Sequence, residues 1–169
     1  FSHHEDRYEG ELKRKQSKGS ATKEFVSANF VNRSCPDLVI VTANGWYIKL
    51  KDEIGFECHS IYDCWDNQPT AERVTQAAKE CAERYPNKRL LIHYIPPHHP
   101  YIGNTASKYL PDYQSQLNES MFSKVRNGNI DISREVIRRC YRENLERGLE
   151  QIDEILPALS GKTVITADH

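Results

Sequence analysis

The chain has no excess of charge of either sign and no long apolar run. Its 169 residues carry 23 Lys and Arg against 24 Asp and Glu, which gives a net charge of -1. A balanced charge argues against the basic surface that nucleic-acid-binding domains present. The apolar runs fall well short of the roughly 20 residues needed to cross a bilayer. We therefore expect neither a nucleic-acid partner nor a membrane span.

The chain also lacks an ordered cysteine framework. It has five cysteines, an odd number at irregular spacing, which is not the pattern of a disulfide-stabilised secreted domain. Together with the lack of a leader-like segment at the start, this predicts a reducing, cytoplasmic setting. The groups Cys58-His59 and Asp63-Cys64 could hold zinc, but structural zinc sites prefer closely paired cysteines. Half-buried thiols in a loop are the preferred interpretation.

What the sequence does contain is an alternation of strand and helix patterns. Leu38–Thr42 is a continuous β-branched run, typical of a central parallel strand that is buried on both faces. The apolar spacing over Thr70–Tyr85 predicts an amphipathic helix, and Lys88–Ile95 predicts a second strand. A short helix with Thr22 at its N-terminal cap is expected earlier. Residues 46–68, which hold both tryptophans, are expected to be irregular, with their aromatic rings packed underneath.

The second half of the chain continues the alternation. Residues 104–130 are polar and are expected to form a long excursion or lid. A long apolar stripe then predicts a helix over 133–156, and Thr163–Thr166 predicts a third buried strand. The pattern indicates one α/β domain over residues 1–169, a three-layer sandwich with a mostly parallel sheet. Residues 1–20 are expected to be a flexible or poorly packed arm.

Two polar groups follow predicted strands directly. A proline-rich loop presents His98 and His99 after the second strand, and the chain ends in Asp168-His169 after the third. Ligands bind at the carboxyl ends of strands in open α/β sheets. Asp and neutral His are suited to zinc, manganese or magnesium. The alternatives are a surface loop with incidental histidines and a strand with a polar tail.

These segments resemble the alkaline phosphatase/sulfatase superfamily. Thr163-Val-Ile-Thr-Ala-Asp-His169 is similar to the metal-binding strand of that superfamily, which usually continues Asp-His-Gly-Glu. Pro97-His-His-Pro-Tyr101 is similar to the Pro-His-x-Pro loop of its sulfatase branch, and Tyr141–Asp153 resembles the helix before the metal strand. The order of further short segments resembles archaeal-type sulfatase-like proteins of unknown function. They are Lys18–Thr22, Val41–Asn44 and Tyr85–Tyr94.

The resemblance implies an alkaline-phosphatase-like fold and a hydrolase or transferase acting on small phosphate or sulfate esters. It implies a divalent metal (Zn, Mn, Mg or Ca) in a complete site, with Asp168 and His169 as ligands. It also implies that His98 contacts the transferring group or its leaving oxygen, with His99 as a further catalytic candidate.

The sequence departs from the family pattern at its start. The family's first strand carries an acidic metal ligand followed by a Ser, Thr or modified Cys nucleophile, and nothing in residues 1–16 has that pattern. The chain does not begin with Met. We expect either a fragment or a degenerate member, and catalysis by these 169 residues alone is not expected. The alternative function is a non-catalytic domain of the same fold that binds an anion or serves in assembly.

Overall fold

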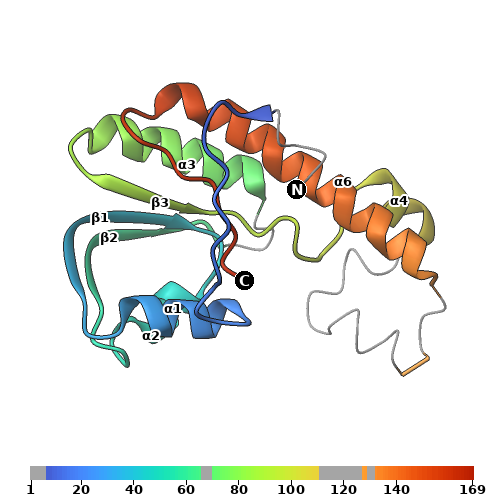
Figure 1. The fold of residues 1–169 in the computed structure, drawn as a ribbon, viewed down its shortest axis with the longest axis horizontal. Coiled ribbons are helices and arrows are strands. Elements are labelled where there is room, and N and C mark those ends of the chain that lie inside the picture. Colours follow the sequence, from blue (N-terminus) through green and yellow to red (C-terminus); the bar gives the residue numbers. More distant parts are fainter. Residues whose placement is uncertain (1–6, 66–69, 111–126, 129–131) are drawn as a thin grey trace.

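The computed structural model describes residues 7–65, 70–110, 127–128 and 132–169. They form an α/β fold around a three-stranded parallel sheet (Figure 1). The elements run α1 (Thr22–Phe30), β1 (Ser34–Thr42), α2 (Trp46–Lys51), β2 (Glu57–Asp63), α3 (Ala71–Arg84), β3 (Arg89–His93), α4 (Asn104–Tyr109), α6 (Arg134–Ile155) and the 3-10 turn η2 (Leu156–Ala158).

Strand β1 lies at the centre of the sheet, in the order β2-β1-β3. It is buried on both faces because its side chains alternate between two cores. Val39 and Val41 pack with residues of α3 and α6, whereas Leu38 and Ile40 pack with residues of α1 and α2. Helices therefore cover both faces of the sheet (Figure 1). The predicted α/β class and parallel sheet are confirmed.

The sheet topology places a switch point between β1 and β3. From β1 the chain moves to β2 on one side, then crosses through α3 to β3 on the other side. The register aligns Thr42 with Asp63 and with His93, so the three residues form one row at the carboxyl edge. Ligands of open α/β sheets bind in the crevice beyond such a point.

Two helix starts are capped by a side-chain hydroxyl. The hydroxyl of Thr70 accepts a hydrogen bond from the backbone N–H of Arg73, and Ser133 does the same for Val136. These bonds satisfy N–H groups that have no partner inside the helix. Thr22 behaves differently from the prediction. It is the first residue of α1 and not its cap, because Ala21 occupies the cap position.

The prediction that residues 46–68 are irregular was wrong in its described part, which contains α2 and β2. Strand β2 is hard to recognise because it lies at the sheet edge, with one neighbouring strand and a largely half-exposed polar surface. The prediction that the aromatic rings of this segment pack underneath was wrong for Trp65, which is 51% exposed.

The predicted third strand at Thr163–Thr166 was also wrong. The segment runs as extended chain without strand pairing, and Val164 is 72% exposed. A β-branched run forms a strand only where a neighbouring strand supplies ladder hydrogen bonds and a face to pack on. In the part of the chain that the structure describes, residues 163–166 pair with none of β1, β2 and β3.

The remaining predicted segments are described in part. Of the predicted lid over 104–130, residues 104–109 form α4, which packs against α6; residues 111–126 and 129–130 lie outside the described residues. The predicted arm over 1–20 is described from Arg7. Its Arg7 pairs with Asp153 of α6, and the hydroxyl of Tyr8 donates to the carbonyl of Leu149. Among the described residues, no helix combines the length and apolarity of a bilayer span.

Candidate functional site

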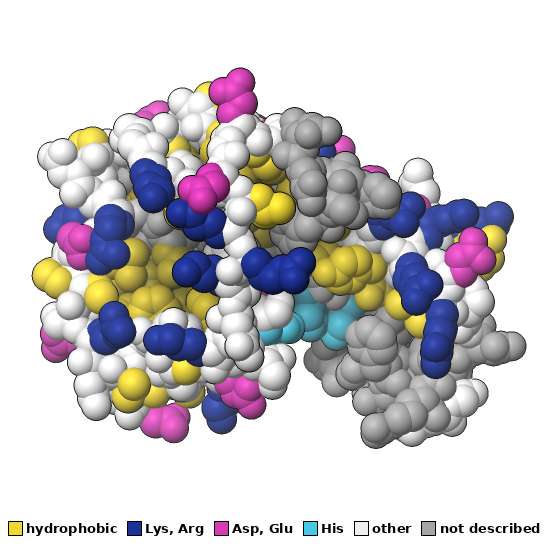
Figure 2. All heavy atoms as spheres, in the orientation of Figure 1, with side chains coloured by type: hydrophobic (Ala, Val, Ile, Leu, Met, Phe, Trp, Pro, Cys, Tyr) yellow, Lys and Arg dark blue, Asp and Glu magenta, His cyan; other side chains and the backbone are white. Residues whose placement is uncertain are grey.

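One hollow, which extends along β3 to the carboxyl edge of the sheet, collects most of the polar residues singled out above. Figure 2 shows histidine side chains gathered in it. Its walls include the end of β3, the proline-rich loop that follows, the start of α2 and the last residues of the chain. His98, His99, Asp168 and His169 all line it, together with His93 and Asn44. The two predicted groups thus border one space, although the third predicted strand does not form.

The His98-His99 loop has a defined geometry. The Nδ1 atom of His98 lies 2.6 Å from the carbonyl oxygen of His99, and the two imidazole rings are 4.1 Å apart. A carbonyl oxygen only accepts hydrogen bonds, so His98 must donate from Nδ1. The neutral ring then carries its lone pair on Nε2. That atom is available to accept a proton, or to donate a hydrogen bond once protonated.

His99 differs from His98 in its environment. Partial burial, and then the neighbouring His98 ring, lower the pKa of His99 to about 4. The imidazole of His99 is therefore neutral at physiological pH. Since a neutral imidazole adds no positive charge, His99 serves better as a packing partner and hydrogen-bonding group than as a cation.

The lowered pKa of His99 predicts a pH dependence of stability. Between pH 6.5 and 4 the unfolded chain binds the proton more readily than the folded chain, so the free energy of unfolding should fall as the pH falls through this window. Urea titrations at stepped pH would measure the slope, and His99→Gln should flatten it. His93, whose pKa is also lowered, contributes a slope of the same sign that remains in this variant. An equal slope in His99→Gln would contradict the prediction.

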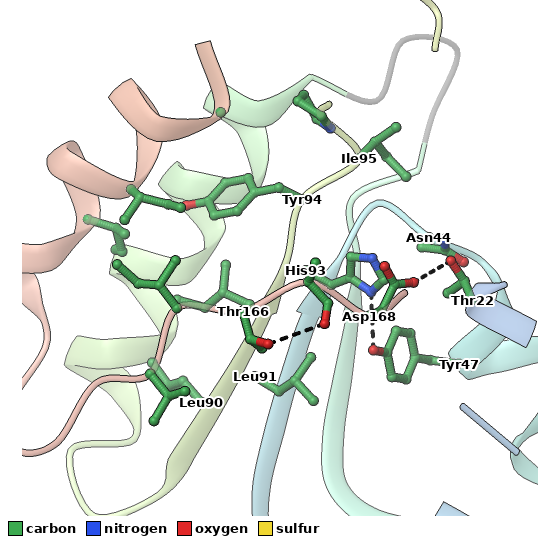
Figure 3. A pocket seen from close by; sticks show the side chains of 18 of the residues that line it. Thr22, Asn44, Tyr47, Leu90, Leu91, His93, Tyr94, Ile95, Thr166 and Asp168 are labelled. Atoms are coloured by element: carbon green, nitrogen blue, oxygen red, sulfur yellow. Dashed lines mark hydrogen bonds between the residues drawn. The ribbon is translucent and has the colours of Figure 1, made fainter. Parts of the chain in front are cut away.

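The Asp168-His169 end is held against α1. The hydroxyl of Thr22 donates to the Oδ2 atom of Asp168 over 2.6 Å, and the hydroxyl of Ser17 donates to its backbone carbonyl. Figure 3 shows Asp168 between Thr22 and His93. The Nε2 atom of His169 lies 3.8 Å from the Oδ1 atom of Asp168. The carboxylate is thus fixed in place by side chains from the far end of the sequence.

His93 and Tyr47 were not predicted as site residues. The Nδ1 atom of His93 lies 3.1 Å from the hydroxyl of Tyr47, and the rings meet edge to face (Figure 3). Burial lowers the pKa of His93, while Asp168 acts to raise it and His169 to lower it. Burial and Asp168 together raise the pKa of Tyr47. Both residues therefore sense the charge of the Asp168-His169 end.

His93 was missed because the predicted second strand ended two residues too late. The predicted strand ran to Ile95, which put His93 inside it. The strand ends at His93 itself. Strand ends are the positions where an α/β sheet presents functional groups, so a boundary two residues earlier would have identified it.

The described residues do not by themselves form a metal centre. They contain no group of three or more His, Cys, Asp or Glu side chains arranged to hold an ion. Asp168 and His169 provide two ligand types, whereas zinc sites need three or four protein ligands. The residues of the alternative zinc group, Cys58, His59, Asp63 and Cys64, form no such cluster among the described residues either. The predicted half-buried thiols in a loop are found only in part: Cys58 is half-buried but lies on β2, whereas Cys64 follows β2 and is buried.

Comparisons with known proteins do not assign this chain to a family. No family model, curated protein or solved structure matches it. The site must therefore be interpreted from its own geometry and chemistry.

Proposed function

We propose that the hollow at the carboxyl edge binds small phosphate or sulfate esters, as part of a hydrolase of the alkaline phosphatase/sulfatase type. One observation carries the proposal. The His98-His99 loop and the Asp168-His169 end border the same hollow, beside the switch point between β1 and β3. The resemblance of both segments to the superfamily's motifs agrees with this position.

The charge around the hollow favours an anionic ligand. Its described lining has three basic side chains, Lys23, Lys49 and Lys162, against Asp63 and Asp168. Lys88 and Arg89 also line it but lie at the amino end of β3, where Arg89 pairs with Asp37. A concave surface lined mainly by one sign of charge concentrates ligands of the opposite sign. This small excess of positive charge supports an anionic ligand.

His98 is the group best suited to the reacting end of such an ester. Its Nδ1 atom is bonded to the His99 carbonyl. The Nε2 atom is therefore the one that can exchange a proton or form a hydrogen bond with the ligand. In the protonated ring Nε2 donates to an ester oxygen and can pass its proton to the leaving oxygen. General acid catalysis of this kind contributes about 10²- to 10⁴-fold in rate.

A divalent metal (Zn, Mn, Mg or Ca) would stabilise charge on the transferring group when bound. Asp168 and His169 are the two candidate ligands. Because the described residues add no third ligand to this pair, no step of the proposal passes through the metal.

A second candidate is a non-catalytic anion-binding or assembly domain of the same fold. It is favoured by the hydrogen bond from Thr22 to Asp168, which already occupies one carboxylate oxygen.

Thermal melting with added anions and metals tests the two candidates. Inorganic phosphate or sulfate should raise the melting temperature in a saturable way, because a ligand at 100 times its Kd stabilises the folded state by about 2.7 kcal/mol. Sodium chloride at equal ionic strength is the control. For the hydrolase, Zn²⁺ or Mn²⁺ should strengthen anion binding, and Asp168→Asn should remove that gain.

The outcomes separate the proposals. Anion binding that no metal strengthens supports the non-catalytic domain. Melting temperatures that no anion shifts, with or without metal, would contradict both candidates.

A further inference from the structure

Asn144 is a fully buried polar residue in the middle of helix α6, with an exposed fraction of 0%. Asparagine is a poor residue for a helix interior, since its side chain competes for backbone hydrogen bonds. A buried asparagine in this position therefore calls for a specific partner. Its three hydrogen bonds all go to the loop that carries His98 and His99.

The amide of Asn144 matches this loop atom by atom. Its Nδ2 atom donates to the backbone carbonyls of His98 and Pro100, both over 3.0 Å. Its Oδ1 atom accepts from the backbone N–H of Ile102, also over 3.0 Å. Two donors and one acceptor on a short side chain are the inventory of asparagine. Aspartate would present acceptors to two carbonyl oxygens, and leucine would satisfy none of the three groups.

The surrounding helix brings the loop close enough for these bonds. One turn after Asn144, a Cβ atom on Gly148 would lie 3.4 Å from the Cβ atom of Pro96, which is van der Waals contact, so α6 lies directly against the start of the loop. One residue before it, Glu143 accepts a hydrogen bond from the backbone N–H of Thr105 over 2.9 Å. Helix α6 therefore contacts the loop before, within and after its histidines.

The bonds bear directly on the orientation of the His98 ring. Asn144 holds the carbonyls of His98 and Pro100, and the carbonyl of His99 lies between them in the chain. That middle carbonyl is the acceptor for Nδ1 of His98. Fixing the two flanking peptides thus fixes the acceptor that selects the tautomer of His98.

We propose that Asn144 is a positioning residue, which holds the His98 loop so that Nδ1 of His98 stays bonded to the His99 carbonyl and Nε2 is presented to the hollow. The importance of Asn144 for ester binding rests on the proposed function. Its effect on the orientation of the His98 ring is independent of that function. Asn144 itself does not touch the ligand.

Imidazole ¹⁵N NMR spectra of the full chain test the proposal. In the wild type, the neutral His98 ring should show its proton on Nδ1. In Asn144→Leu and Asn144→Asp this preference should be lost, with the two nitrogens averaging between tautomers. The matched control is Val74→Ala, a truncation in the α3 core. It should lower stability without changing the His98 signals.

A measurement on the wild type tests the proposal even if the Asn144 variants fail to fold. The two side-chain amide protons of Asn144 should be protected from hydrogen exchange to the same extent as backbone amides of α6. Rapid exchange of these protons, or unchanged His98 signals in a folded Asn144→Leu variant, would overturn the proposal.

Binding of inorganic phosphate is measured in parallel. If the wild type binds no anion while the His98 signals respond to Asn144, the proposed function fails and the positioning role stands. If the wild type binds phosphate and both variants bind it equally well with unchanged His98 signals, the positioning role fails alone.

Discussion

Replacing Tyr47 with alanine is expected to lower the free energy of unfolding by about 3–5 kcal/mol, the range for removing a large buried aromatic side chain. Tyr47 is 1% exposed, packs in the core between the sheet and α1, and meets the ring of Phe30 edge to face. Its removal leaves a cavity under β1 and takes away the hydroxyl beside His93. Urea unfolding followed by circular dichroism would measure the loss.

The variant Tyr47→Phe separates the two contributions. It keeps the ring and removes only the hydroxyl, so His93 loses a partner at Nδ1 and the expected cost is about 1 kcal/mol. The pKa of His93, followed by NMR, should change in this variant because its hydrogen bond is gone. Equal destabilisation by Phe and Ala would contradict the assignment of Tyr47 mainly to packing.

Replacing His98 with alanine is expected to lower kcat/KM for 4-nitrophenyl phosphate or sulfate by about 10²- to 10⁴-fold in any preparation that turns over these esters. The reason is the loss of the Nε2 atom of His98, whose ring is held by the bond from Nδ1 to the His99 carbonyl. Stability should change little, because His98 is exposed. Initial rates over a range of substrate concentrations would measure the effect.

His59→Ala is the matched control for His98→Ala. His59 is also exposed and does not itself line the hollow. Its ring lies 5.0 Å from that of Tyr85, which precedes β3, whereas His98 follows the carboxyl end of that strand. The removal of His59 should leave kcat/KM unchanged. A similar loss in both variants would show that the effect of His98→Ala is not specific to the site.

The sequence was most informative where one principle decides the structure. The apolar run Leu38–Thr42 and the amphipathic stripe of α3 both need a partner to cover their apolar side chains, and both formed the predicted kind of element. Strand β1, however, begins earlier than predicted, at Ser34. The long helix α6 was predicted to within about a turn for the same reason. Thr163–Thr166 failed because strand formation depends on a neighbour that local propensity cannot supply.

The site divides in the same way. The position of His98 and His99 after a strand could be predicted from the order of residues along the chain. The contacts of Asn144 and Tyr47 could not, since each depends on a helix meeting a loop or strand more than 40 positions away in sequence. Periodicity within one helix shows which face is buried but not what that face meets.

The two halves of the site also differ in how far apart along the chain their contacts lie, and this sets an order of assembly. The bonds from Asn144 to the His98 loop close segments of 44 and 46 residues, whereas the bond from Thr22 to Asp168 closes one of 146. Loop-closure entropy grows with the logarithm of segment length, so the second closure costs about 1 kcal/mol more than the first. During folding the histidine loop should therefore be in place on α6 before the Asp168 end docks.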